Sequence, residues 1–218
     1  MFHAQGISLV YGGGSAGIMG EVARTLVGLS GPQAVHGVIP SALIRFERDV
    51  VQNKAAEKLD QTMVSDESTR KQLLSESEFG RTSVVPDMHT RKQLMAQEVM
   101  AGGEGSGFVA LSGGYGTLEE LMEVTTCKWD RVVTMDASRL IDVTGNQLGI
   151  HSKPIIVYNV DGYYDGLLSW VRNAVESGFI SEGNRNIMVE TKTPEEVLKA
   201  LQTYRIAEGQ FKLDWKQK

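Results

Sequence analysis

The chain has 218 residues, 41% of them hydrophobic and 22% charged, and a formal net charge of −5. This length and apolar content suffice for one substantial core and predict a single domain over residues 1–208 with a polar tail at 209–218, while the mild charge argues against broad electrostatic binding of nucleic acid. Because Cys127 is the lone cysteine, an intrachain disulfide and a cysteine metal cluster are both excluded.

Short apolar runs alternate with amphipathic stretches along the chain. Residues 49–82 are polar and mixed, which predicts an excursion with one or two exposed helical turns. Short apolar strands separated by helices are typical of an α/β fold with a parallel sheet covered on both faces. The predicted order is strand 6–11, helix 17–29, strand 34–39, strand 82–85, helix 89–100, strand 108–111, helix 117–126, strand 154–159, helix 163–177, strand 187–189 and helix 194–204.

A glycine-rich turn follows the first predicted strand. Gly12, Gly14 and Gly17 match GxGxxG between a strand and a helix, a spacing found in dinucleotide-binding folds. The next strand ends in Pro40 without an acidic residue for a ribose diol, and Glu47 comes too late for that role. We therefore favour a structural tight turn, or a loop that lines a mononucleotide pocket, over a dinucleotide site.

Residues 86–95, PDMHTRKQLM, form a second cluster of interest. Arg91 and Lys92 are adjacent cations near the start of a predicted helix, where the helix dipole disfavours positive charge. A bound anion would offset that cost, with Arg91 gripping phosphate or carboxylate in a planar fork and Lys92 adding a point charge. Without other evidence, the spacing favours a solvated Arg-Lys pair over an anion site.

The run 112–120, SGGYGTLEE, follows the apolar stretch 107–111 and opens a predicted helix. Glycines let backbone N–H groups approach a phosphate, and the positive end of the new helix points at it. Glu119 and Glu120 diverge by about 100° around the helix, so one should face a pocket and the other the surface or a subunit contact. The pattern predicts a nucleotide-cleaving site, and spacing alone leaves the choice of carboxylate open.

Four segments together resemble the LONELY GUY family of cytokinin-activating phosphoribohydrolases: GGGSAGIMG at 12–20, MHTRKQLM at 88–95, SGGYGTLEE at 112–120 and NQLGIHSKPIIVYNVDGYYDGLL at 146–168. The similarity extends from Gly6 to about Ser181, with the motifs in the family's order. It implies a Rossmann-like fold, a homodimer or larger assembly, and hydrolysis of cytokinin riboside 5′-monophosphates to the free base and ribose 5-phosphate. It implies no metal or redox cofactor.

The resemblance also assigns roles to individual residues. Glu120 matches the family's catalytic carboxylate, and Arg91 matches its second essential residue. Glu120 would stabilise oxocarbenium character on the ribose and orient water, while Arg91 would hold an anionic or leaving-group part of the substrate. The positions that would contact the substrate are Glu47, Lys92, Thr126, the run Gly113, Gly114, Tyr115, Gly116, Thr117, Leu118 and Glu119, and Gly13 and Gly14 of the first turn.

The sequence departs from the family pattern at three places. Ser112 stands where most members have proline, a mild change because proline would only stiffen the loop. The family's first strand and helix, which lie at the centre of its sheet, have no counterpart here. We therefore expect unpaired backbone groups and either poor solubility or an incomplete pocket.

The third departure is an insertion at 127–145, between EVTT and NQLGIH, where the family has EVTTWNQLGIH. Cys-Lys can be encoded TGT-AAG, which contains a GTAAG splice donor, and Thr-Gly can be encoded ACA-GGG, which contains an AG acceptor. Removing the interval would restore a Trp codon. We therefore hypothesise a retained in-frame intron, and the absent first unit fits a faulty gene model of the same kind.

Two other classes of function stay open: a nucleosidase acting on AMP or other common 5′-monophosphates, and a nucleotide-binding protein without catalysis. Lysine decarboxylation has no support, because no lysine lies in a context suited to holding pyridoxal phosphate. The sequence also lacks both an apolar stretch long enough to span a bilayer and a secretory signal segment. We therefore expect a cytoplasmic protein without membrane or nucleic-acid partners.

Overall fold

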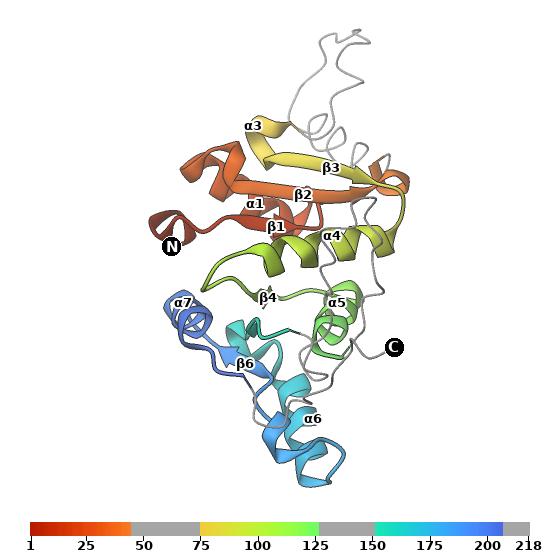
Figure 1. Cartoon of the computed structure of the whole chain (residues 1–218), viewed down its shortest axis with the longest axis vertical. Helices are drawn as coiled ribbons and strands as arrows, with labels where there is room; N and C mark the ends of the chain where they lie inside the picture. The colour runs from red at the N-terminus through yellow and green to blue at the C-terminus, as the bar shows by residue number, and fades with distance from the viewer. Residues whose placement is uncertain (45–74, 127–150, 207–218) are drawn as a thin grey trace, which may run out of the picture. The chain divides into compact units, whose positions relative to one another are not determined.

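The computed structural model describes residues 1–44, 75–126 and 151–206 (Figure 1). The chain divides into two compact units, unit 1 (Met1–Met95) and unit 2 (Ala96–Lys218). Each unit contains a three-stranded parallel sheet accompanied by helices, which confirms the α/β class. The strands form two sheets, however, where the sequence predicted one.

Unit 1 places β2 (Val35–Pro40) between β1 (Leu9–Tyr11) and β3 (Arg81–Val85). The register pairs Tyr11 of β1 with Gly37 of β2. Every residue of β2 is buried, as expected for a central parallel strand covered on both faces. The helical segments of this unit are the 3-10 helices η1 (Phe2–Gln5), η2 (Pro32–Ala34) and η3 (Ser41–Leu43), and the α-helices α1 (Gly17–Ser30), α3 (Glu76–Phe79) and the first part of α4 (Met88–Ala101).

Helix α1 supplies the apolar face that covers the sheet of unit 1. Its buried residues belong to one cluster with side chains from β1, β2 and α3, because apolar positions three and four apart share one face of a helix. The cluster includes Tyr11, the last residue of β1 before the glycine turn. Its buried members are Tyr11, Ala23, Leu26, Val27, Val35 and Phe79.

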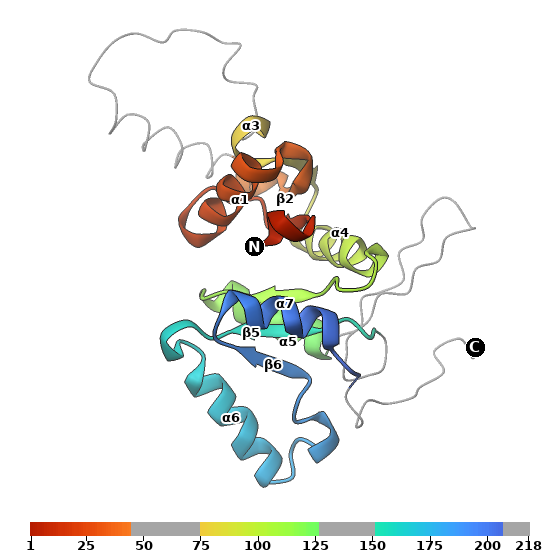
Figure 2. The same ribbon diagram turned by 90° about the vertical axis from the view of Figure 1, so that its left-hand side faces the viewer.

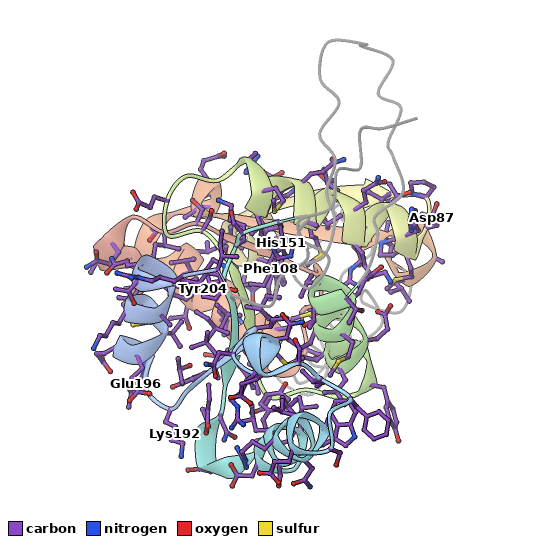
Figure 3. The ribbon with its side chains drawn as sticks, turned by 60° about the horizontal axis from the view of Figure 1, so that its bottom comes forward. Asp87, Phe108, His151, Lys192, Glu196 and Tyr204 are labelled. Carbon is purple, nitrogen blue, oxygen red and sulfur yellow. The ribbon has the colours of Figure 1, made fainter. Side chains whose placement is uncertain are left out.

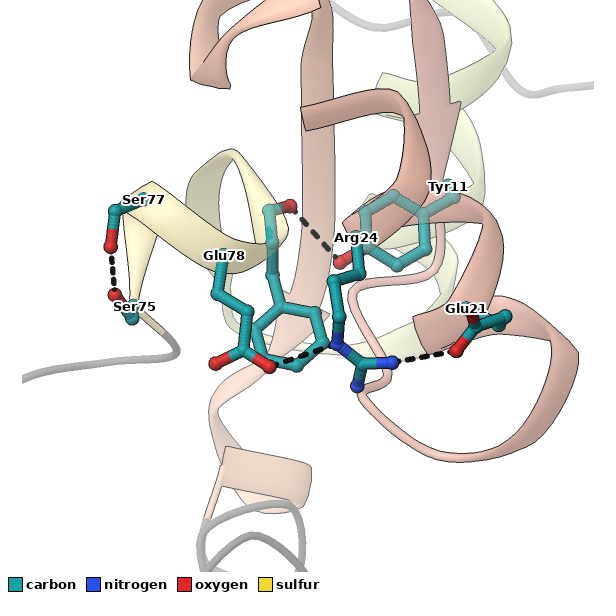
Figure 4. A network of polar contacts seen from close by, with 7 residues as sticks. Tyr11, Glu21, Arg24, Ser75, Ser77 and Glu78 are labelled. Carbon is teal, nitrogen blue, oxygen red and sulfur yellow. Dashed lines mark hydrogen bonds and ion pairs between the residues drawn. The ribbon is translucent and has the colours of Figure 1, made fainter. Parts of the chain in front are cut away.

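Polar contacts join α1 to the short helix α3 (Figure 4). Arg24 Nε donates to Glu78 Oε1 at 2.9 Å, and Arg24 Nη1 donates to Glu21 Oε2 at 2.7 Å. The same guanidinium lies 5.1 Å from the centroid of the Phe79 ring. The Tyr11 hydroxyl donates to the Phe79 carbonyl at 3.3 Å, so β1 and α1 both hold the segment that leads into β3.

Unit 2 places β5 (Ile155–Tyr158) between β4 (Phe108–Ala110) and β6 (Met188–Thr191). The register pairs Phe108 with Ile155 and Ile155 with Met188. The helical segments are α5 (Tyr115–Thr126), η5 (Val160–Gly162), α6 (Asp165–Glu176), η6 (Glu182–Asn184) and α7 (Pro194–Thr203).

Helices cover both faces of the sheet in unit 2. Ile155 and Val157 pack in a cluster with Leu121 of α5 and Leu168 of α6. Ile156 points to the opposite face by strand alternation, and α7 packs against β5 and β6 there (Figure 2). The start of α7 is fixed by a capping box in which Thr193 and Glu196 satisfy each other's backbone N–H groups.

Most predicted elements are confirmed, with ends that differ by a few residues. The first strand starts at Leu9 rather than at Gly6, because Gly6 is the C-cap of η1 and has φ 64°. Helix α5 starts at Tyr115 rather than at 117, so Gly116 and Thr117 belong to its first turn. Of the polar excursion at 49–82, only the end is described, and the insertion at 127–145 and the tail at 209–218 lie outside the described residues.

The two sheets have one feature in common at their edges. Within the described part of the chain, β1 pairs only with β2, and β4 pairs only with β5. An edge strand presents backbone N–H and C=O groups that can pair with another chain. The expected poor solubility or incomplete pocket, like the assignment of 1–208 to a single domain, stays a prediction.

Candidate functional site

The glycine-rich run in unit 2 forms the start of α5. Leu118 N–H donates to the Gly114 carbonyl at 3.2 Å, so the helical hydrogen bonds begin at Gly114. The N–H groups of the first helical turn have no partner within the helix, and they concentrate its positive end. Gly114 and Gly116 are exposed, and a Cβ added at either would meet no described atom within 4 Å. The backbone here is therefore open to a ligand.

Gly113 differs from the two open glycines. A Cβ at this position would overlap Oγ1 of Thr117, so the loop folds tightly onto the first turn of the helix. On its carbonyl side, Gly113 accepts a hydrogen bond from the Tyr163 hydroxyl at 2.5 Å, and Leu111 accepts one from the Tyr164 hydroxyl at 2.5 Å. The lack of a side chain at Gly113 thus allows the loop to fold against Thr117, whereas its lack at Gly114 and Gly116 leaves the backbone accessible.

The two glutamates of α5 lie in different surroundings. Glu119 is exposed and Glu120 is half-buried, as their separation of about 100° around the helix permits. Glu120 is therefore the better candidate for a carboxylate that faces a ligand, and its catalytic role stays a prediction. Among the other predicted contact residues of this helix, Tyr115 is 93% exposed and Leu118 is half-buried.

The buried side chain of His151, labelled in Figure 3, contacts the C-terminal half of α5. Its Nδ1 accepts from the Lys153 N–H at 3.2 Å, so Nε2 carries the proton and donates to the Val124 carbonyl at 3.0 Å. The ring is 6% exposed and lies 5.5 Å from the Phe108 ring, centroid to centroid. Burial lowers the pKa of His151, which favours the neutral ring that this arrangement requires.

Thr126 ends α5. Its hydroxyl donates to the Met122 carbonyl at 2.7 Å, and the neighbouring Thr125 hydroxyl donates to the Leu121 carbonyl at 2.7 Å. Thr125 is buried and Thr126 is exposed, so of these two threonines Thr126 is the accessible one. Its assignment to substrate binding stays a prediction.

Arg91 is the central functional candidate of unit 1. Its side chain comes from α4 and is 9% exposed, and Nε donates to the Val38 carbonyl near the end of β2 at 3.3 Å. A Cβ at Gly12 would overlap Nη2 of Arg91. The glycine at the end of β1 therefore makes the space in which the guanidinium lies.

The rest of the first glycine turn is closely packed. Gly13 has φ 74°, a left-handed conformation that glycine adopts without strain, and a Cβ there would lie 3.0 Å from Cβ of Ile39. Gly14 is buried as well. This packing supports the interpretation of a structural tight turn, and the role of Gly13 and Gly14 in substrate binding stays a prediction.

Asp87 explains how α4 tolerates two cations near its start. Its carboxylate accepts from the Thr90 N–H at 2.7 Å and from the Thr90 hydroxyl at 3.1 Å, as an N-cap residue does. The hydrogen bond from the Thr90 backbone is the largest cause of the lowered pKa of Asp87. Arg91 is buried and Lys92 half-buried, so the structure does not present them as the solvated pair considered from the sequence.

The structure brings some of the predicted site residues together. Arg91 meets the turn at Gly12, and the run Gly113–Glu120 forms one continuous loop and helix start. Glu47 lies outside the described residues. Sequence reasoning missed Asp87, His151, Tyr163 and Tyr164. Asp87 carried a local signal, a possible cap three residues before Thr90, whereas the contacts of the other three join distant segments.

Among the described residues, no group of three or more His, Cys, Asp or Glu side chains could hold a metal ion. None of the helices described here is both long and apolar enough to cross a membrane.

Comparison with known proteins gives these features a family context. The chain matches the family model described as "Possible lysine decarboxylase" over residues 19–132 and 134–201. It is 38% identical over 217 residues to a probable cytokinin riboside 5′-monophosphate phosphoribohydrolase of Oryza sativa subsp. japonica, covering 97% of this chain and 77% of the rice protein. The chain belongs to the LONELY GUY family. The resemblance seen in its four motifs is thereby confirmed.

Two further relatives define how much of this LONELY GUY chain is shared. A cytokinin riboside 5′-monophosphate phosphoribohydrolase of Arabidopsis thaliana is 38% identical over 198 residues, covering 91% of this chain and 68% of the plant protein. A bifunctional cytokinin biosynthesis protein of Fusarium pseudograminearum (strain CS3096) is 42% identical over 213 residues, covering 98% of this chain. The chain spans 37% of the fungal protein's length.

The surroundings of Lys153 in unit 2 differ from those of a lysine that holds pyridoxal phosphate, so they give no support to the family model's description as a possible lysine decarboxylase. Lys153 Nζ donates to the carbonyls of Gly102 and Gly103 and to the Ser106 hydroxyl, at 2.7, 3.0 and 2.6 Å. These bonds tie the end of α4 to the segment before β5. Lys153 in this LONELY GUY chain therefore has a structural role.

Proposed function

We propose that the chain hydrolyses the N-glycosidic bond of cytokinin riboside 5′-monophosphates, releasing the free base and ribose 5-phosphate. The observation that carries the proposal is the start of α5, where exposed glycines and N–H groups without a partner inside the helix precede a half-buried glutamate. The plant relatives, which are named cytokinin riboside 5′-monophosphate phosphoribohydrolases, support the choice of substrate.

The first step is binding of the 5′-phosphate. The N–H groups at the start of α5 and the positive end of the helix favour an anion with several acceptor oxygens. Gly114 and Gly116 let the phosphate approach the backbone without a side chain between them. A phosphate held there would fix the ribose relative to residues of the second helical turn.

The second step is cleavage of the bond between ribose C1′ and the base nitrogen. The bonding electron pair leaves with the base, which takes up a proton, and water supplies the hydroxyl group at C1′. Positive charge develops on the ribose in the transition state, and the Glu120 carboxylate stabilises it and orients the water. A neutral amide at 120 would keep the shape of the side chain and lose this charge.

Arg91 has a separate part in the reaction. Its guanidinium is held by the Val38 carbonyl and by the space at Gly12, so its orientation is fixed before substrate binds. A fixed planar donor group suits recognition of an anionic or leaving-group part of the substrate. Lys92, Thr126, Glu47, Gly13 and Gly14 are proposed as further contact residues on the resemblance alone.

The resemblance also supports a homodimer or larger assembly and a cytoplasmic location for this chain. These two proposals have separate checks. Light scattering of the purified chain measures the assembly, with a dimer or larger species expected and a monomer at working concentration contradicting it. Imaging of a tagged chain in its own cells checks the location.

The test of the proposed function compares two substrates. Release of free base is measured from AMP and from an N6-prenylated AMP at equal concentration. We expect the prenylated nucleotide to be cleaved with the higher kcat/KM. Faster cleavage of AMP would instead identify a general nucleoside 5′-monophosphate nucleosidase, and nucleotide binding without release of any base would identify a binding protein.

A further inference from the structure

Two consecutive tyrosines reach back from the start of α6 to the loop that leads into α5. The Tyr164 hydroxyl donates to the Leu111 carbonyl and the Tyr163 hydroxyl donates to the Gly113 carbonyl, both at 2.5 Å. The two rings contact each other edge to face, with centroids 5.0 Å apart and planes at 88°. The hydroxyls therefore hold alternate carbonyls of one short loop.

A buried amide fixes the turn that carries this tyrosine pair. Asn159 is 1% exposed, and its Oδ1 accepts from the Tyr164 N–H at 2.7 Å. Its Nδ2 donates to Asp165 Oδ1 and to Glu190 Oε1, each at 2.8 Å. The turn is thereby anchored both to α6 and to β6.

The backbone between Asn159 and the tyrosines reverses sharply. Asp161 has φ 52° and Gly162 has φ 74°, two successive residues in the left-handed region. Asp tolerates this conformation better than most side chains, and glycine adopts it freely. The reversal turns the chain so that the next two side chains point toward the α5 loop.

Holding a carbonyl also sets the direction of the next amide. A trans peptide group is planar, so its N–H points opposite to its C=O. With the Leu111 and Gly113 carbonyls bound to tyrosine hydroxyls, the N–H groups of Ser112 and Gly114 point away from the tyrosines. The tyrosines thereby orient two backbone donors at the start of the glycine-rich run.

We propose that Tyr163 and Tyr164 are positioning residues of the nucleotide site, and that their hydroxyls orient the Ser112 and Gly114 N–H groups for the substrate phosphate. This inference rests on the proposed function of the α5 loop. It assigns a purpose to the pair of tyrosines in the segment NVDGYYDGLL beyond packing of α6.

The different burial of the two tyrosines separates positioning from simple stabilisation. Tyr164 is 3% exposed, and burial raises its pKa, so its hydroxyl stays protonated as a donor. Tyr163 is 56% exposed. An exposed hydrogen bond contributes little to folding because water competes for both partners. A bond from Tyr163 to the loop is thus better explained by the orientation of the loop than by stability.

The test removes only the two hydroxyl groups. We expect Tyr163→Phe and Tyr164→Phe each to raise KM for the nucleotide by about fivefold to tenfold, with kcat nearly unchanged, because a phosphate contact is lost equally before and during the reaction. Tyr163→Phe should keep the melting temperature of the wild type. Tyr158→Phe is the matched control, since the Tyr158 hydroxyl makes no hydrogen bond to the loop in the described structure, and it should keep the wild-type KM.

Calorimetric binding of AMP separates this inference from the proposed function. If the wild type cleaves no nucleotide but binds AMP, and Tyr163→Phe binds it fivefold to tenfold more weakly, the positioning role stands and the proposed reaction fails. If the wild type is active and Tyr163→Phe has the wild-type KM and AMP affinity, the positioning role is overturned and the reaction stands. A fall in kcat that follows a lower melting temperature would also overturn it, since it would show a purely structural role.

Discussion

The two glycine-rich turns of this protein have similar sequences and different surroundings. In the turn after β1, Gly12 leaves room for the Arg91 guanidinium and Gly13 packs against Ile39. In the turn before α5, a Cβ added at Gly114 or Gly116 would meet no described atom within 4 Å. The first turn is filled by the protein itself, and the second is available to a ligand.

This difference shows that a glycine can serve a site in two ways. At Gly12 it permits the close approach of a functional side chain, so its contribution passes through Arg91. At Gly114 and Gly116 it exposes the backbone, so the contribution is direct. Composition does not separate these cases, since both turns follow a strand and precede a helix.

The largest expected effect comes from the helix that follows the open turn. Glu120→Gln should lower kcat for base release by about 100- to 1,000-fold, because the amide cannot stabilise positive charge on the ribose. The change keeps the side-chain shape, so the melting temperature should stay close to that of the wild type. Steady-state kinetics with an N6-prenylated AMP measure this.

Glu195→Gln is the matched control for that variant. Glu195 is an exposed glutamate in the first turn of α7, on the opposite face of the sheet from α5. Its activity should equal that of the wild type. Wild-type turnover by Glu120→Gln would remove the catalytic assignment from this helix.

A substitution in the turn after β1 should lower activity by displacing Arg91. Gly12→Ala places a methyl group where Nη2 of Arg91 lies, and the flexible end of the arginine can move aside. We expect the chain to stay folded while kcat/KM falls by about 100-fold, because a displaced catalytic group loses most of its effect. Circular dichroism and kinetics on the same sample check both parts.

Gly28→Ala controls for the added methyl group. Gly28 lies in α1, and a Cβ there meets no described atom within 4 Å. This variant should gain up to about 1 kcal/mol of unfolding free energy, from the better helix propensity of alanine, and keep its activity. Equal activity of the two variants would contradict the proposed link between Gly12 and Arg91.

In the turn before α5, an added methyl group should increase stability and weaken substrate binding. Gly116→Ala adds a methyl group in the first turn of α5, where φ does not require glycine, so the unfolding free energy should rise by about 0.4–1 kcal/mol. The same methyl group should raise KM by about tenfold if the phosphate approaches this backbone. Urea unfolding and kinetics measure the two effects, and an unchanged KM would mean that the phosphate lies elsewhere.

The smallest expected effect is on the pH dependence of stability, through the contact of His151 with the C-terminal half of α5. The pKa of His151 is lowered from 6.5, chiefly by burial, so the folded state binds fewer protons than the unfolded state. The stability that neutral His151 contributes is therefore complete above pH 6.5 and is lost as the pH falls through the folded pKa. The urea midpoint of the wild type should therefore fall as the pH decreases from 6.5 to the lower pKa of folded His151.

His151→Gln provides the comparison, because glutamine does not titrate. Its urea midpoint should be lower than that of the wild type above pH 6.5 and should fall less steeply below it. Parallel pH profiles for the two proteins would show that His151 has no part in the pH dependence.

The sequence predicted the elements well because their signals are local. Buried strands such as β5 are short apolar runs, and amphipathic helices such as α6 show their period directly. The start of α5 was placed two residues late because glycines oppose helix formation, yet Gly116 lies in its first turn. The division into two sheets carries no local signal, since it depends on which strands pair.

The site was predictable only where its residues adjoin in sequence. The run from Gly113 to Glu120 is such a segment, and the motif resemblance located it. The packing of Arg91 on Gly12 and the bonds from Tyr163 and Tyr164 to the α5 loop join segments far apart in the chain. Such contacts follow from tertiary structure, which spacing within one sequence does not reveal.

The products formed by the wild-type chain test the proposed reaction most directly. Free base, ribose 5-phosphate, nucleoside and inorganic phosphate are quantified during a time course with an N6-prenylated AMP. Cleavage at C1′ predicts free base and ribose 5-phosphate in equal amounts, with neither nucleoside nor inorganic phosphate. Release of phosphate with nucleoside, or bound nucleotide without ribose 5-phosphate, would contradict the assignment of this chain as a phosphoribohydrolase.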